Sequence, residues 1–275
     1  MNDFSTDVPW VIFRLLNQQF AVSIKYVREM VTLPKVVAVP QMPPHVRGVI
    51  DLRGKVFPVL DLRMRLGMRS LLAEVEDIIH LLDAREEEHK NWIAELESSV
   101  GEHREFTLTT DPHECAFGKW YDNFKTENRT LAGCLKKFDA PHKEIHSVAV
   151  KVKESVAKED FDSAYEIINQ TKKGALAEMI GLFSEAKMLM REANREIAVC
   201  LELQGKVIAA TVDAIETVEK MSETNFEALP ESICSLNNSY IAGIGKRKNG
   251  TDLVQLLEIE KVIHQEEEFI NSLVA

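Results

Sequence analysis

The sequence lacks the long apolar segments that a membrane-spanning protein needs. No apolar run approaches the roughly 20 residues required to cross a bilayer. The first ten residues, MNDFSTDVPW, also lack a basic stretch followed by an apolar one, so no secretory signal peptide is expected. Hydrophobic residues make up 45% of the 275 and charged residues 28%, as in ordinary globular chains. We therefore expect a cytoplasmic protein that is not inserted in a membrane.

Positive charge and cysteine are both scarce. The chain has 33 Lys and Arg against 44 Asp and Glu, which gives a formal net charge of −11. A nucleic-acid-binding protein needs a basic surface for its phosphate contacts, so we expect no nucleic-acid partner. The four cysteines are widely spaced and do not make a disulfide framework.

The first zone of the chain, residues 10–67, predicts β structure. Apolar runs of strand length occur at 11–16 and 20–22, and further short runs lie within 49–60. Four prolines within residues 34–44 exclude regular helix from an extended connection. Short strands at close spacing with turn signals are typical of a barrel or sandwich.

The second zone, residues 70–195, has the period of a helix. An apolar stripe at helical spacing runs through residues 82–96 and contains one histidine, His89. A second stripe covers residues 149–156, and a third runs from 161 to 193. An antiparallel helical bundle is the natural way to bury three such faces.

The third zone, residues 197–257, returns to apolar runs of strand length. Two of them, at 197–201 and 206–210, are separated by Gln204-Gly205, a pair that suits a hairpin turn. Each β zone has only about seventy residues, which is small for an independent domain. The fold class we expect is therefore mixed α and β, with a β domain interrupted by a helical insertion.

The expected domain boundaries follow from these zones. Residues 1–69 and 194–275 form one discontinuous β domain, and residues 70–193 form the inserted helical domain.

Histidine and cysteine carry the sharpest chemical signal. His142 and His146 are four residues apart on a predicted helix, so their rings project from one face. His89 faces the core of the bundle, and Cys115 lies in an aromatic segment. Together these four side chains fit a tetrahedral Zn²⁺ site with one sulfur and three nitrogen ligands.

The residues alone leave alternatives open. A buried histidine on an apolar face is more often a hydrogen-bonded core residue, and an i, i+4 pair arises by chance on exposed helices. Cys134 and His113 are alternative ligands, and His80 lies half a turn off the stripe of His89. On this reasoning, a metal site and an ordinary core are equally well supported.

Three short motifs resemble the signatures of the chemoreceptor zinc-binding (CZB) family: HKNW at 89–92, CAFGKWY at 115–121 and PHKEIH at 141–146. Their order and spacing agree with the family, and the resemblance covers roughly residues 75–160. It implies a small helical bundle that binds Zn²⁺.

The same resemblance implies the ligands and a sensory role. The four ligand positions fall on His89, Cys115, His142 and His146. The family is associated with sensing zinc or hypochlorous acid, the latter through the zinc-bound cysteine. The resemblance also allows a homodimer formed through the helical insertion.

The flanking β zones resemble the chemotaxis coupling protein family CheW. The stretches that carry this resemblance are residues 20–30, 46–64 and 197–257. It implies a double β-barrel domain, in which two small barrels share one hydrophobic core, and an adaptor that bridges methyl-accepting chemoreceptors and the histidine kinase CheA. The family normally has a short loop where this chain carries the insertion.

The CheW resemblance also suggests partner-binding residues. Glu29 and Arg53 match an acid and an arginine that form a surface pair near the receptor-binding face. Arg47, which like Arg53 precedes a glycine, is a further candidate for partner contact.

These observations predict an adaptor without catalytic activity and with an internal zinc site that senses zinc or an oxidant. Zinc would hold Cys115 as a thiolate, the form that oxidants attack. One alternative is a constitutive coupling protein in which zinc is purely structural. A second is a zinc-dependent hydrolase with Glu144 as general base, but four protein ligands leave no position for an activated water.

Overall fold

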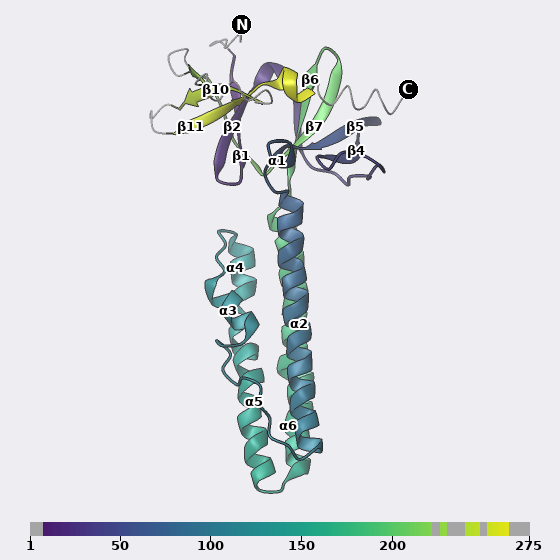
Figure 1. The fold of residues 1–275 in the computed structure, drawn as a ribbon, viewed down its shortest axis with the longest axis vertical. Coiled ribbons are helices and arrows are strands. Elements are labelled where there is room, and N and C mark those ends of the chain that lie inside the picture. Colours follow the sequence, from purple (N-terminus) through teal and green to yellow (C-terminus); the bar gives the residue numbers. More distant parts are fainter. Residues whose placement is uncertain (1–7, 222–225, 230–239, 248–251, 264–275) are drawn as a thin grey trace. The chain divides into compact units, whose positions relative to one another are not determined.

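The computed structural model describes residues 8–221, 226–229, 240–247 and 252–263. Its internal contacts divide the chain into two compact units (Figure 1). The β unit comprises residues 1–71 and 195–275, and the helical unit comprises residues 72–194. In the part of the chain that is described, no helix is long and apolar enough to cross a membrane.

The β unit contains two sheets. The first has the strand order β8-β1-β2-β11-β10-β9 and the second has the order β3-β6-β7-β5-β4. The strands of the first sheet are β1 (Trp10–Leu15), β2 (Gln18–Ser23), β8 (Ala214–Glu219), β9 (Phe226–Ala228), β10 (Ile241–Lys246) and β11 (Leu253–Leu257). Those of the second are β3 (Val27–Thr32), β4 (Val46–Leu52), β5 (Lys55–Asp61), β6 (Ile197–Leu203) and β7 (Lys206–Val212).

Both sheets combine strands from before and after the helical unit. In the first sheet β2 pairs in parallel with β11, and in the second β5 pairs in parallel with β7, where Leu60 lies opposite Ala210. Strand β3 pairs antiparallel with β6. Neither chain segment can therefore complete a sheet without the other.

The two sheets share a central hydrophobic core. Phe13 and Phe20 from the first sheet and Leu60 and Leu201 from the second are at most 2% exposed within it. Each sheet also buries its other face in a smaller cluster, as expected when a sheet curls on itself. Two sheets around one common core confirm the expected double β architecture.

Two tight hairpins follow from the turn residues. Gln204 and Gly205 have φ values of 51° and 82°, and Arg53 and Gly54 have φ values of 56° and 80°. Two positive φ values in a two-residue loop indicate a type I′ turn, which suits the twist of antiparallel strands. The hairpin expected at Gln204-Gly205 is confirmed, and the second turn places Arg53 at the tip of the β4–β5 hairpin.

Strand β3 and the short helix α1 (Leu62–Arg65) were not among the expected elements. The sequence of β3, VREMVT, alternates between half-buried and exposed residues. Helix α1 begins where the Asp61 carboxylate accepts the backbone N–H of Met64 at 3.0 Å, which is an N-terminal cap.

Ion pairs within the β unit hold the two chain segments that adjoin the helical unit; we call them the junction pairs. At the outgoing segment, the buried Arg63 of α1 donates two hydrogen bonds to Asp213, at 2.7 and 2.5 Å. At the returning segment, Arg47 donates to Glu196, directly before β6. The side chain of Arg47 is only 15% exposed. Arg47 is therefore paired within the unit, and its expected partner contact stays a prediction.

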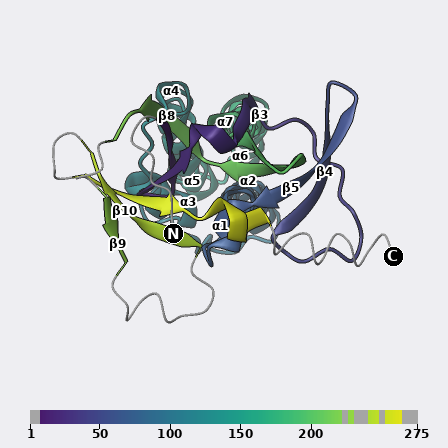
Figure 2. The same ribbon diagram turned by 90° about the horizontal axis from the view of Figure 1, so that it is seen from above.

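The helical unit is a bundle, seen along its helices in Figure 2. Its elements are α2 (Leu71–Gly101), α3 (Ala116–Asn123), α4 (Arg129–Lys136), α5 (Asp139–Ala157), α6 (Phe161–Thr171), a single π-helical turn η2 (Lys172–Leu176) and α7 (Ala177–Ala193). The three expected apolar stripes lie on α2, on α5 and on the continuous α6–η2–α7 helix. In the core of the helical unit, the rings of Phe117, Phe138 and Phe183 pack together with their centroids 5.0–5.2 Å apart.

Candidate metal centre

Three elements of the helical unit bring one cysteine and three histidines together. His89 lies on α2, Cys115 directly precedes α3, and His142 and His146 lie one turn apart on α5. The four potential ligand atoms all lie within 4.8 Å of one another. The histidines are at most 4% exposed, and Cys115 is partly exposed. The structure thus gathers all four residues that the sequence singled out.

Hydrogen bonds to the backbone orient two of the imidazoles. Nδ1 of His89 lies 2.7 Å from the carbonyl oxygen of Arg85, one helical turn earlier, and so carries the proton. Its Nε2 then points a lone pair toward the Sγ of Cys115, 4.0 Å away. A metal-binding histidine typically donates its second ring N–H in this way.

His146 supplies the observation that best tests whether a metal fits. Its Nδ1 lies 3.3 Å from the carbonyl oxygen of Thr109, while its buried Nε2 has no hydrogen-bond partner in the described chain. A buried polar atom without a partner costs about 1–3 kcal/mol. A metal ion between Nε2 and the neighbouring ligand atoms would remove this cost, so the residues present fit the ion.

Cys115 is held in place by the start of α3. Its Sγ accepts the backbone N–H of Gly118 at 3.1 Å, and His142 Nε2 lies 3.2 Å from the same sulfur. Gly118 is required here because a Cβ at this position would lie 1.9 Å from the carbonyl oxygen of Pro112. The glycine therefore allows the preceding loop to pass close over the helix and to place the cysteine.

The electrostatic environment keeps the imidazoles neutral. Burial, together with the neighbouring His89 and His146, lowers the pKa of His142 to about 3. Burial and His89 lower the pKa of His146 to about 4, and burial also lowers the pKa of His89. Burial raises the pKa of the Cys115 thiol. The metal-free cluster is therefore three neutral imidazoles and a protonated thiol at pH 7.

One sulfur and three nitrogens are a donor set suited to Zn²⁺. With Zn–S near 2.3 Å and Zn–N near 2.0–2.1 Å, a tetrahedral site separates its ligand atoms by about 3.3–3.6 Å. The separations of Cys115 Sγ from the two nearest imidazole nitrogens, 3.2 and 4.0 Å, bracket this value. Small side-chain shifts would bring all four ligand atoms to coordination distance from one ion.

The alternative ligands lie elsewhere. His113 is exposed and pairs with Asp122 at 2.9 Å. Cys134 is buried away from the cluster, and His80 is exposed. Glu144, the general base that a hydrolase would need, is exposed and lies outside the cluster.

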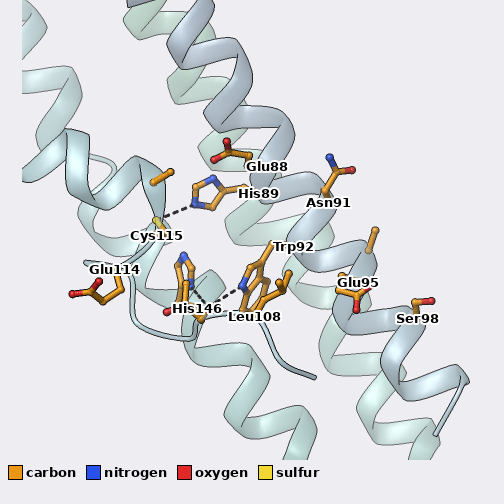
Figure 3. A pocket seen from close by; sticks show the side chains of 13 residues that line it. Glu88, His89, Asn91, Trp92, Glu95, Ser98, Leu108, Glu114, Cys115 and His146 are labelled. Carbon is orange, nitrogen blue, oxygen red and sulfur yellow. Dashed lines mark hydrogen bonds between the residues drawn. The ribbon is translucent and has the colours of Figure 1, made fainter. Parts of the chain in front are cut away.

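A cleft of about 730 Å³ leads from solvent to the cluster. Its lining includes His89, Cys115 and His146, which point toward one another in Figure 3. Trp92 lies beside His146, with ring centroids 5.1 Å apart, and donates its indole N–H to the Thr109 carbonyl at 2.9 Å. Nothing in the sequence points to Thr109, because its contribution is a backbone carbonyl that any residue could supply.

The expected Glu29–Arg53 pair is present in the β unit. Their charged atoms lie 3.3 Å apart, and the Arg53 side chain is 85% exposed at the hairpin tip. They border a groove of about 430 Å³ whose lining also includes Arg28, Lys55 and Phe57. The basic residues and the aromatic ring make this an amphipathic surface.

Comparison with known proteins agrees with the two resemblances. The CheW-like domain family matches residues 9–91 and 175–267, and the chemoreceptor zinc-binding domain family matches residues 89–153. A probable chemotaxis protein CheW of Rhizobium etli is 37% identical over 75 residues, which cover 27% of this chain and 48% of that protein. The chemotaxis protein CheW of Bacillus subtilis is 31% identical over 98 residues, covering 36% of this chain and 62% of that protein.

The chain thus spans less than two thirds of the length of these relatives. The crystal structure of scaffolding protein TtCheW from Thermoanaerobacter tengcongensis aligns with 92% of this chain and 84% of its own, at 13% identity and a TM-score of 0.42. That score is too low to add to the fold assignment. The CheW-like match alone covers more than half of the residues, in two segments on either side of most of the zinc-binding match. The chain therefore belongs to the CheW-like domain family and carries a chemoreceptor zinc-binding domain within it.

Proposed function

We propose that this protein is a chemotaxis adaptor that couples chemoreceptors to the histidine kinase CheA, and that its helical unit senses zinc or an oxidant such as hypochlorous acid. The observation that carries the proposal is the buried cluster of His89, Cys115, His142 and His146, within a chain of the CheW-like family. Four protein ligands form a closed zinc site, which suits sensing or structural support rather than hydrolysis.

The groove beside Glu29 and Arg53 is our candidate for receptor docking. An exposed arginine at a rigid hairpin tip presents a charge that an acidic partner residue can meet, and Phe57 adds apolar contact area. Arg47 has a further role in this proposal. In addition to any partner contact, it stabilises the unit by neutralising Glu196.

Cys115 is our candidate for the oxidant-sensitive group. Zinc binding would hold it as a thiolate, and it is the partly exposed cysteine among the three that the structure describes, since Cys134 and Cys200 are buried. Cys234 lies outside the described residues. Oxidation to a sulfenate would weaken the sulfur ligand and loosen the loop that carries it.

The experiment is a reconstitution of receptor, CheA and this protein, with kinase activity measured with and without zinc and hypochlorous acid. Arg53→Glu should reduce receptor control of the kinase and leave zinc content unchanged, because the groove and the cluster belong to separate units. Cys115→Ser should abolish the oxidant response, while Cys134→Ser serves as the buried-cysteine control. If zinc removal unfolds the helical unit without changing kinase control, zinc is purely structural and the sensory part of the proposal falls.

A further inference from the structure

The segment of residues 102–114 connects α2 to α3 and leads directly into Cys115; we call it the strap. All of its residues are described, and none belongs to a helix or strand. Leu108 and Thr109 of the strap line the cleft together with residues of α2 (Figure 3). Because the Nε2 atom of His146 is buried, an ion reaches it only when part of the structure moves. The strap is the part that can move without unwinding a helix.

An ion pair network fastens the strap near its start. Arg104 donates hydrogen bonds to the carboxylates of Glu95 on α2, at 2.5 Å, and of Glu102, at 2.6 Å. These bonds lower the pKa of both carboxyl groups, so that both are charged at neutral pH. The Arg104 side chain is 37% exposed, and exposed ion pairs contribute little stability. This fastening therefore opens easily.

An aromatic contact fastens the strap further along. The ring of Phe106 packs edge-on against Trp92 of α2, with the centroids 4.9 Å apart. The same Trp92 is buried and donates its indole N–H to the Thr109 carbonyl. The start of the strap is fixed separately, because His103 has a left-handed φ of 52° and packs its ring on Phe161 of α6. The strap thus returns along α2 from a fixed start and is held there by two contacts.

We infer that detachment of the strap from α2 limits both the entry and the release of zinc, and that Arg104 and Phe106 control its rate. The inference rests on the proposed zinc site and adds the residues that govern exchange of the ion. Neither side chain offers a ligand atom to the cluster, so both stabilise the closed strap equally with and without the ion. Loss of either contact therefore accelerates entry and release by the same factor. The Kd, which is the ratio of the two rates, stays unchanged.

The test measures metal exchange in the full-length protein and in the variants Arg104→Gln and Phe106→Ala. Association is followed by stopped flow with Co²⁺, whose bond to a thiolate absorbs light. Release of Co²⁺ and of Zn²⁺ is measured with a chelator, at concentrations where the rate no longer depends on the chelator. Arg191→Gln is the matched control, since Arg191 forms an exposed ion pair between α7 and Glu76 of α2 that involves no strap residue.

Arg104→Gln should raise the association and release rates about threefold each, as expected for the loss of an exposed ion pair. Phe106→Ala should raise both rates about tenfold, because an aromatic pair is lost. Arg191→Gln should change neither rate. Unchanged rates in both strap variants would overturn the inference. A faster release without faster association would also overturn it, because the replaced side chain would then contribute to affinity rather than to the rate of opening.

The indole N–H of Trp92 gives a second readout that needs no metal. It is buried and bonded to a strap carbonyl, so its hydrogen exchanges with solvent only when the strap detaches. In the metal-free protein, NMR should show about threefold faster exchange of this hydrogen in Arg104→Gln, with the indole of Trp10 in the β unit as internal reference. Unchanged exchange would overturn the inference. Faster metal exchange without any effect of zinc or oxidant on kinase control would instead refute the proposed sensory function and leave the role of the strap intact.

Discussion

The indole N–H of Trp92 and the imidazole Nδ1 of His146 contact the same carbonyl oxygen, at 2.9 and 3.3 Å respectively. That oxygen belongs to Thr109, in the segment that connects α2 to α3 and leads into Cys115. Trp92 therefore fixes a group that orients a candidate metal ligand, although it offers no ligand atom itself. The two contacts tie the connecting segment to the cluster.

Replacement of Trp92 by Phe should weaken zinc binding about tenfold, because outer-shell partners of metal ligands typically contribute 10–100-fold to affinity. The phenyl ring keeps most of the packing and removes only the N–H. Competition with a chromophoric chelator measures the affinity. Trp120→Phe is the control, since Trp120 packs on Phe124 and lies outside the cluster. Equal affinity in the two variants would show that the hydrogen bond does not position His146.

Zinc binding at pH 7 should release about one proton per ion. The lowered pKa values of the three cluster histidines mean that these ligands are already deprotonated, whereas the raised pKa of Cys115 means that its thiol still holds a proton. Calorimetric titration in buffers of different ionisation enthalpy gives the number directly. Release of two or more protons would show that a histidine is charged in the metal-free protein.

The metal-free helical unit should lose stability as the pH falls from about 6.5 toward 4. The pKa of His142 is about 3 and that of His146 about 4 in the folded protein, below the ordinary value of 6.5. Between these values the unfolded chain binds more protons than the folded chain, so the free energy of unfolding decreases with falling pH. Urea unfolding followed by circular dichroism at several pH values checks this. His142→Gln should flatten the dependence.

Gly118→Ala should disrupt the placement of Cys115. The added methyl group would meet the Pro112 carbonyl oxygen at 1.9 Å, so the loop above α3 must move and the sulfur with it. We expect a clear loss of zinc affinity. Gly133→Ala on α4 is the matched control, because a Cβ there meets nothing within 4 Å, and alanine should stabilise the helix by about 0.5–1 kcal/mol. Unchanged zinc affinity in Gly118→Ala would contradict the close approach.

Residues 1–69 joined to 194–275 by a short linker should fold without the helical unit. Both sheets and the central core between them are built within the β unit. A single cooperative transition in urea, measured by tryptophan fluorescence from Trp10, is the expected result. An insoluble product or a gradual transition would mean that the β unit depends on the helices.

The sequence predicts local features of this fold well. The turn at Gln204-Gly205 is readable because a glycine that accepts positive φ separates two apolar runs. The apolar stripe that includes His89 is readable because helical period and burial coincide. Strand β3 is not predictable from the sequence. Its six residues alternate only between half-buried and exposed, and the strand runs directly into the proline-rich connection.

Long-range partners were not predictable in the same way. Arg47 looks like an exposed turn charge in sequence, but its partner Glu196 lies 149 residues later. The convergence of Cys115 with the histidines depends on the path of the segment between α2 and α3, which no periodic pattern encodes. The family resemblance supplied that information for the four ligands, while the roles of Thr109 and Trp92 required the structure.

The junction pairs anchor the β unit on both sides of the insertion, independently of the inserted sequence. Arg63 and Asp213 secure the chain before it leaves the unit, and Arg47 and Glu196 secure it after it returns. All four side chains belong to the β unit, so the anchoring does not depend on what the chain does in between. A different helical hairpin, spliced between Ser70 and Asn194, would inherit both anchor points. Helical insertions of other sequence would thus be exchangeable at this site while both sheets of the β unit stay the same.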